Sequence, residues 1–270
     1  MTSRRGCHLI YATKAATDYA ATCDVVKVTG PWAIDDLGLA HDYAACTIYR
    51  HIWTPTEQDA LIAAGRDGAR RAVAAVQAAL YPHDLYPTYI ESLNETHQRL
   101  GAGLEEHIAW LRHFTEIAHP LGYQVIGFNF STGGVEYADL EACVYAEWGG
   151  ADVVGIREYW GQDFDHRFRT INLIRNTAAY AGRESPKIFV GECGRDTVGE
   201  GPRLGWRAQG VPAEYFAREL ADYAEACAAL GIDVTPYTHG ANYGGGPQPW
   251  DSFDLDGVGL GAASPKVEVN

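Results

Sequence analysis

Two glutamates follow apolar, β-favouring runs of the chain. Asn94 and Glu95 end the segment YIESLNE at 89–95, and Glu192 stands in the segment KIFVGECG at 187–194. A carboxylate at the end of a buried strand costs free energy unless it is paired or used. Two carboxylates about 5–5.5 Å apart can serve as acid/base and as nucleophile in the hydrolysis of a glycosidic bond with retention. We therefore expect Glu95 to be the acid/base and Glu192 the nucleophile, with Asn94 donating a hydrogen bond to the sugar 2-hydroxyl.

The elements that must position these residues are short strands separated by helices. Eight apolar runs rich in Val, Ile, Tyr or Phe predict strands. They cover residues 8–12, 25–30, 46–52, 88–95, 124–130, 152–159, 187–193 and 233–239. Apolar residues at helical spacing predict helices over 56–80, 104–118 and 213–230, while the helices after the first two strands must be short. This order predicts an α/β protein, a parallel (β/α)8 TIM barrel in one domain spanning 1–270. An open, doubly wound sheet is the alternative.

In a barrel of this kind, the chemistry lies at the carboxyl ends of the strands. Polar and aromatic residues gather at the predicted strand ends and in the loops that follow them. The expected substrate-binding residues are Asn94, Arg50, His51, Asn129, Tyr159, Trp160, Trp206, His239 and Trp250. Trp32 and Trp53 also follow strands, and aromatic faces stack on the apolar faces of sugars. The long, glycine-rich loop 194–211 is expected to fold over the mouth and to place Trp206 against the sugar.

The two glutamate segments resemble those of a known group of enzymes. YIESLNE resembles the fourth-strand signature of the clan A retaining glycoside hydrolases, and KIFVGECG resembles their seventh-strand nucleophile segment. The resemblance implies a (β/α)8 β-glycosidase in which Tyr159 hydrogen-bonds the nucleophile. It also implies that Glu91 points into the barrel, where we expect a structural role. The chain departs from the clan at Thr96, where proline often stands, and at the eighth strand, which ends in Tyr237-Thr238-His239 rather than in tryptophan.

Composition narrows the possible partners. The formal net charge is −14, with 35 acidic residues against 21 lysines and arginines. This balance argues against nucleic acid and anionic membranes as partners, and it favours a neutral carbohydrate substrate. No pair of the six cysteines has CxxC spacing, so neither a zinc knuckle nor a redox pair is suggested. No metal and no other cofactor are expected. The cysteines suit a reducing compartment, and no signal-peptide or transmembrane pattern is seen, so a cytoplasmic location is expected.

Two other functions fit parts of the same pattern. In a divalent-metal-dependent sugar isomerase or epimerase barrel, Glu95 and Glu192 would be metal ligands, with His239 as a third. Against this function, no clear Asp or His ends the fifth or sixth predicted strand. In a barrel that binds sugar without cleaving it, the glutamate pair would have no purpose.

Overall fold

The computed structural model describes residues 4–11, 13–42, 44–95, 103–161, 164–197, 204–238, 251–255 and 258. In this part of the chain, eight parallel strands pair in sequential order, β1 to β8. Their bounds are β1 Gly6–Leu9, β2 Val25–Thr29, β3 Cys46–Arg50, β4 Tyr89–Glu91, β5 Gln124–Phe130, β6 Val153–Trp160, β7 Ile188–Arg195 and β8 Asp233–Pro236. β8 returns to β1, where the Thr238 hydroxyl donates to the carbonyl of His8 at 3.1 Å. The predicted (β/α)8 barrel is confirmed.

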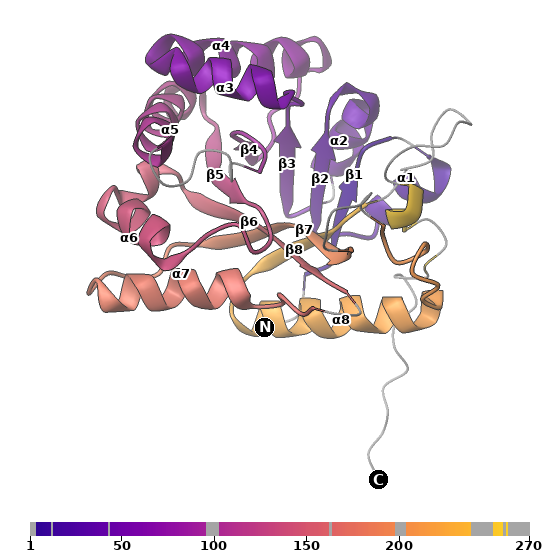
Figure 1. Cartoon of the computed structure of the whole chain (residues 1–270). Helices are drawn as coiled ribbons and strands as arrows, with labels where there is room; N and C mark the ends of the chain where they lie inside the picture. Colours follow the sequence, from indigo (N-terminus) through magenta and orange to yellow (C-terminus); the bar gives the residue numbers. More distant parts are fainter. Residues whose placement is uncertain are drawn as a thin grey trace.

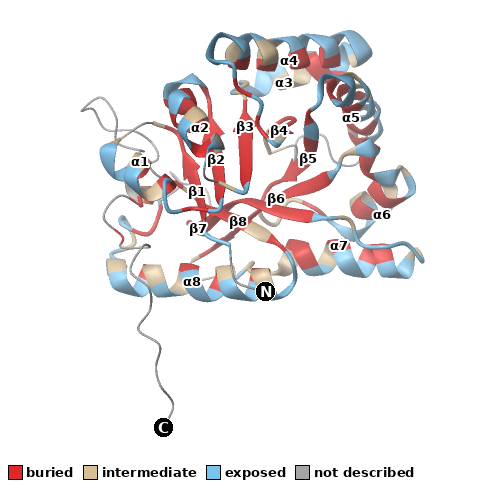
Figure 2. Ribbon diagram, turned by 180° about the vertical axis from the view of Figure 1, so that it is seen from behind, coloured by how far each residue is buried: buried red, intermediate tan, exposed pale blue. Residues whose placement is uncertain are grey.

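The helices surround the strands and turn their apolar sides inward (Figures 1 and 2). Their bounds are α1 Lys14–Ala20, α2 Ile34–His41, α3 Pro55–Ala63, α4 Gly65–Leu80, α5 Leu104–Ala118, α6 Tyr137–Tyr145, α7 Arg169–Tyr180 and α8 Ala213–Ala229. Short 3-10 helices add η1 Pro31–Ala33, η2 Tyr81–His83, η5 His119–Leu121, η6 Glu147–Gly150 and η7 Asp251–Phe253. Among the described residues, no helix is long and apolar enough to span a membrane.

Several element boundaries differ from the predicted ones for local reasons. The predicted helix 56–80 is two helices, because the chain leaves helical geometry at Ala64 between α3 and α4. α3 begins at a capping box in which the Thr54 hydroxyl and the Glu57 carboxylate satisfy each other's backbone amides. β4 ends at Glu91, four residues before the predicted end. The backbone N–H of Asn94 then donates to the side-chain oxygen of Gln58 in α3 at 2.8 Å.

Two different layers of side chains line the barrel interior. Near the start of the strands lies a small apolar cluster, separate from the main core between strands and helices. It contains Val25, Cys46, Ile48, Ile126, Val153 and Phe189. Above it lies a layer of buried charges formed by Lys27, Glu91 and Arg157, each with no exposed surface. The period-2 alternation of a strand places Lys27 on the same face as Val25, and Arg157 on the same face as Val153.

Bulges in two strands change which side chains face the interior. In β7 one extra residue falls between Val190 and Cys193, relative to both neighbouring strands. Strict alternation from the interior residue Phe189 would turn Glu192 outward, but the bulge turns it inward. Gly191 leaves room for this arrangement, since a Cβ atom there would lie 3.0 Å from Arg157 Nη1 and from Glu91 Oε1. In β5, a second bulge between Gly127 and Phe130 turns Asn129 inward.

Candidate active site

Glu192 is the centre of a buried ionic cluster at the carboxyl end of the barrel. Arg50 of β3 donates from Nη1 to Glu192 Oε1 at 2.6 Å, and Arg157 Nε of β6 lies 3.2 Å from Glu192 Oε2. The hydroxyl of Tyr159 donates to the same Oε2 at 3.0 Å. This is the contact that the resemblance to clan A implies. Both carboxylate oxygens are therefore oriented by charged or polar donors.

The cluster also fixes the charge of the glutamate. Burial alone would raise the pKa of Glu192, but the positive charges of Arg157, Arg50 and Lys27 outweigh it and lower the pKa to about 2. The same surroundings act in the opposite direction on Tyr159, because burial and the Glu192 charge raise the pKa of its hydroxyl well above the usual value. Near neutral pH, Glu192 is thus an anion and Tyr159 is a neutral donor.

A second pair supports this layer from below. Lys27 Nζ lies 2.8 Å from Glu91 Oε1 and 4.0 Å from Glu192 Oε1, and it donates to the carbonyl of Gly191 at 3.0 Å. Burial lowers the pKa of Lys27 to about 7, although the Glu91 charge opposes the shift. Glu91 also lies 3.9 Å from Arg50 Nε. The predicted structural role of Glu91 inside the barrel is confirmed.

Asn94 connects the ionic cluster to the mouth of the barrel. Its Oδ1 accepts hydrogen bonds from Arg50 Nη1, at 2.8 Å, and from Arg157 Nη2. Since two guanidinium groups hold the oxygen, the amide orientation is fixed, and the NH2 group is the part that remains to donate elsewhere.

Glu95 follows Asn94 and is half-buried. Its backbone φ is +42°, a left-handed conformation that costs a non-glycine residue about 1 kcal/mol or more. Burial is the main cause of the raised pKa values of Tyr159 and Tyr237, and the charges of Glu192 and Glu95 contribute to both. Glu95 and Glu192 therefore lie within electrostatic range of the same two hydroxyl groups.

Two of the expected substrate contacts, His51 and Trp160, do not face the barrel interior. His51 directly follows β3 on the side opposite to the inward-facing Arg50, and its ring lies 4.4 Å from that of Trp53. Trp160 alternates with Tyr159 and is 2% exposed, and its Nε1 donates to Glu219 of α8 at 3.4 Å. The neighbouring Glu158 also faces outward and accepts from backbone amides at the start of α7, including Phe168 and Thr170.

Trp206 was expected to contact the sugar from a lid over the mouth, but its surroundings show that this prediction is wrong. The ring is 5% exposed and stacks on Phe216 of α8, with centroids 5.2 Å apart. Its Nε1 donates to the carbonyl of Asp254 at 3.2 Å, and Arg207 covers the ring at 4.7 Å. Trp206 anchors its loop to the outer helix and is not placed to stack on a sugar. Loop residues 198–203 lie outside the described part of the chain.

The remaining expected residues divide between the interior and the undescribed segments. Asn129 is fully buried and donates to the carbonyl of Leu93 at 2.8 Å, so it supports the turn that carries Asn94 and Glu95. Gly155 makes room for it, since a Cβ atom there would lie 2.1 Å from Asn129 Oδ1. His239 and Trp250 lie outside the described residues.

Two cluster members were missed by the sequence reasoning, although a signal for each was present. Arg157 precedes Tyr159 by two residues, so alternation places both on the inward face of β6. Lys27 interrupts the apolar run VVKVT, where a charge is unusual unless it faces a partner. Within the described part of the chain, no group of three or more His, Cys, Asp or Glu side chains is placed to hold a metal ion.

Comparisons with known proteins bear chiefly on the fold. No family model matches the chain. A stretch of 102 residues is 33% identical to a ferrochelatase from Geotalea daltonii, but it spans only 37% of this chain and 30% of that protein, which is too little to assign a family.

Among solved structures, one match is a glycoside hydrolase family 17 β-1,3-glucanosyltransferase from Rhizomucor miehei. It has a TM-score of 0.60 at 12% identity and covers 94% of this chain and 92% of that chain. Another is a GH128 endo-β-1,3-glucanase mutant from Amycolatopsis mediterranei in complex with laminaritriose and laminaribiose. It has a TM-score of 0.54 at 14% identity and covers 92% and 96% of the two chains. At these identities the likeness shows that the chain shares the (β/α)8 barrel of these enzymes, the fold expected for clan A.

Proposed function

We propose that this protein is a retaining glycoside hydrolase that cleaves β-glycosidic bonds of a neutral saccharide. The observation that carries the proposal is the state of Glu192. Its carboxylate is oriented through both oxygens by Arg50, Arg157 and Tyr159 and turned into the barrel by the β7 bulge, and the neighbouring cations hold its pKa low. An oriented anion at this place suits nucleophilic attack on an anomeric carbon.

The chemistry then runs in two steps. In the first, Glu192 attacks the anomeric carbon while Glu95 gives its proton to the leaving oxygen, so that the glycosidic C–O bond breaks and an ester to Glu192 forms. In the second, Glu95 takes a proton from water, which attacks the same carbon and releases Glu192. The NH2 group of Asn94, fixed by the two guanidinium groups on its oxygen, would donate to the sugar 2-hydroxyl.

The charges around Glu192 argue against the metal-dependent isomerase alternative. A divalent cation requires anionic oxygen ligands, whereas Glu192 lies between three cationic side chains, Lys27, Arg50 and Arg157. The same cations favour a neutral substrate. Each is already engaged by Glu91, Glu192 or Asn94, so in the described part of the site a sugar carboxylate would have to compete with them.

The structural matches suggest which saccharides to test first. Because two of these proteins are β-1,3-glucan enzymes, we propose β-1,3-linked glucan as the first substrate class. At the rim, Trp32 and Trp53 remain the aromatic side chains proposed to stack on sugar rings. Trp32 is 50% exposed, in the loop after β2.

The test is a screen of aryl β-glycosides and laminari-oligosaccharides, followed by trapping with a 2-deoxy-2-fluoro glycoside. Peptide mass analysis should locate the trapped sugar on Glu192. Glu192→Gln should abolish turnover of every substrate, and Glu184→Gln, a change at an exposed glutamate between α7 and β7, should leave it intact. Binding without turnover would identify a sugar-binding barrel, and a label on another residue would remove Glu192 from its role.

A further inference from the structure

A second cavity opens at the other end of the barrel from the candidate active site. It has a volume of about 720 Å³. Its lining comes from the first residues of the strands, including Cys46 of β3, Tyr89 of β4 and Val153 of β6, together with the end of α8. Because the strands are parallel, their first residues share one end of the barrel, and Glu192 stands near the opposite end. Side chains normally fill the interior of an eight-stranded barrel, so a cavity of this size is a departure that needs an explanation.

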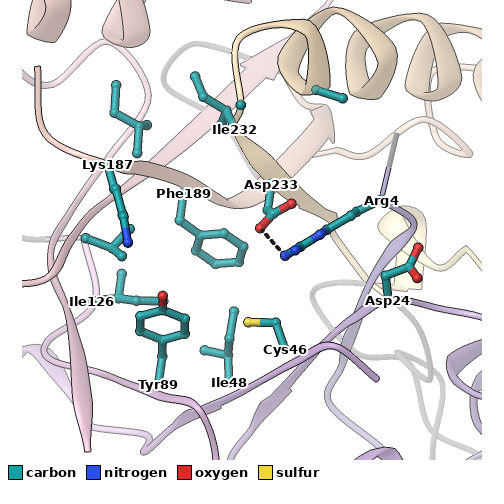
Figure 3. Close-up of a pocket in the computed structure, with 14 residues that line it drawn as sticks. Arg4, Asp24, Cys46, Ile48, Tyr89, Ile126, Lys187, Phe189, Ile232 and Asp233 are labelled. Atoms are coloured by element: carbon teal, nitrogen blue, oxygen red, sulfur yellow. Dashed lines mark hydrogen bonds and ion pairs between the residues drawn. The ribbon is translucent and has the colours of Figure 1, made fainter. Parts of the chain in front are cut away.

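The inner wall of the cavity is apolar. Ile48, Ile126 and Phe189 form it, and all three belong to the small cluster at the start of the strands. In Figure 3 the ring of Phe189 lies at the centre of these side chains. Cys46 adds a thiol, but burial raises its pKa to about 12, so it stays protonated and acts as an apolar group. The volume falls in the range of about 300–1,000 Å³ that is typical of small-molecule sites.

The rim is polar, and its two sides differ. On one side in Figure 3, Arg4 pairs with Asp233 at 3.4 Å, with Asp24 nearby. Asp24 accepts from the backbone amide of Arg5 at 3.0 Å, so these charges are already engaged. On the other side lie Lys187 and Tyr89. Among the described residues, no carboxylate lies within ion-pair distance of the Lys187 ammonium group. Burial raises the pKa of the Tyr89 hydroxyl, which keeps it protonated as a donor.

The layer of buried charges separates this cavity from the candidate active site. Lys27, Glu91 and Arg157 have no exposed surface and fill the barrel between the apolar cluster and Glu192. A ligand in the cavity therefore has no direct path to the catalytic glutamates.

We propose that this cavity is a binding site for a small monocarboxylate with an apolar body. The apolar part lies against Ile48, Ile126 and Phe189, and the carboxylate receives the charge of Lys187 and a hydrogen bond from Tyr89. An amine is disfavoured on this side by the Lys187 charge, and an uncharged alcohol leaves that charge unpaired.

The test uses three probes that share an eight-carbon chain: octanoate, which is negative at pH 7, octylamine, which is positive, and octanol, which is uncharged. Their binding to the full chain is measured by calorimetric titration at pH 7. Octanoate should bind with one-to-one saturation, at least tenfold more tightly than either other probe. Lys187→Ala should weaken octanoate about tenfold, whereas Lys14→Ala should not, because this exposed lysine pairs with Asp18 elsewhere. Val153→Phe should remove binding by filling the cavity, and Cys46→Phe is a second filling variant if the first does not fold.

The proposal stands apart from the proposed function. Octanoate should bind equally to wild type and Glu192→Gln, whether or not the protein cleaves glycosides. Equal affinity for octanoate and octanol, with no effect of Lys187→Ala, would overturn the carboxylate assignment. Absence of saturable binding, or undiminished binding to a folded filling variant, would overturn the site itself.

Discussion

At the scale of single residues, the acid/base role of Glu95 is the assignment with the sharpest chemical signature. Glu95→Ala removes the proton donor, so substrates with poor leaving groups should lose most turnover. Substrates with good leaving groups should still form the glycosyl-enzyme at near-normal rates, because they need little protonation. Hydrolysis of that intermediate should be slow, and azide, which needs no general base, should restore the rate and yield a glycosyl azide. Product analysis by mass spectrometry checks this prediction. Rescue by azide without glycosyl azide would rule the assignment out.

The charge of Glu192 gives a prediction about stability against pH. Its folded-state pKa, about 2, is below the ordinary value of 4.5, so the ionised group favours the folded state. This contribution is fully present above pH 4.5 and is lost as pH falls toward 2. The shift corresponds to a contribution from Glu192 to the free energy of unfolding on the order of 3 kcal/mol. Glu192→Gln should therefore be less stable than wild type by this order at pH 7, and the difference should shrink between pH 4.5 and 2.

Urea unfolding at pH 7, 4 and 3 measures this difference. Glu184→Gln is the matched control, since this glutamate is exposed and should show no comparable pH-dependent difference. A gap between wild type and Glu192→Gln that stays constant down to pH 3 would show that the ionic cluster does not hold Glu192 ionised in the folded protein.

Site residues could be predicted from the sequence only where the alternation of inward and outward side chains along each strand was applied consistently. Tyr159 lies against Glu192 as implied, and Arg157, two residues earlier, could have been found by the same period. Trp160 and His51 were assigned to the mouth although each is adjacent to an inward-facing residue, so alternation should have turned both outward.

At the scale of elements, β7 shows why part of the site could not be predicted. Alternation from Phe189 gives the wrong face for Glu192, and the extra residue that corrects it leaves no clear mark in KIFVGECG except Gly191. By contrast, the bounds of α5 match the predicted helix 104–118, because Leu104, Ile108, Leu111 and Phe114 mark one buried face. Long periodic helices are encoded locally, whereas a bulge depends on how two neighbouring strands pair.

The β7 bulge leads to a prediction at Gly191. A methyl group there would lie 3.0 Å from Arg157 Nη1 and Glu91 Oε1, and 3.1 Å from Lys27 Nζ. Three buried charged groups would have to move together, so Gly191→Ala should lower the free energy of unfolding by about 1–3 kcal/mol. It should also lower kcat, because Glu192 shares these cations. Denaturant unfolding and kinetics on an aryl glycoside measure both effects. Wild-type stability and kcat in this variant would mean that the charged layer is not packed against the bulge.

At the scale of the whole molecule, the barrel separates its roles by layer. Helices bury the outer faces of the strands (Figure 2). The apolar cluster lines the cavity at one end, and the charged layer isolates that cavity from Glu192. This order follows from parallel strands, since residues at equal depth on different strands meet in one layer. The sequence predicted the barrel but not the cavity, because a cavity results from the side-chain volume that several distant strands leave unfilled.

The end of the barrel that carries Glu192 also has an exposed apolar strip. The ring centroids of Trp32 and Tyr11 lie 5.0 Å apart. Trp32 and Ile52 both pack on Gly30, since a Cβ atom at Gly30 would lie 3.1 Å from Trp32 and 2.6 Å from Ile52. Trp32 and Ile52 are 50% and 42% exposed. The three residues follow β1, β2 and β3, so the strip borders the barrel mouth. Exposed aromatic rings beside the proposed saccharide site suit stacking on sugar units next to the cleaved one.

Trp32→Ala should therefore lower kcat/KM for long substrates more than for short ones. Loss of the ring should lower kcat/KM on a β-1,3-glucan polymer roughly tenfold, about 1.4 kcal/mol of transition-state binding, because a sugar unit away from the cleaved bond loses its contact. An aryl monoglycoside does not reach the strip, so its kcat/KM should stay within about twofold of wild type. Tyr81→Ala is the control, since Tyr81 is 81% exposed and precedes β4 at the other end of the barrel. Equal losses on both substrates would place Trp32 in the support of the catalytic centre, and no loss on the polymer would show that the glucan follows another path across the mouth.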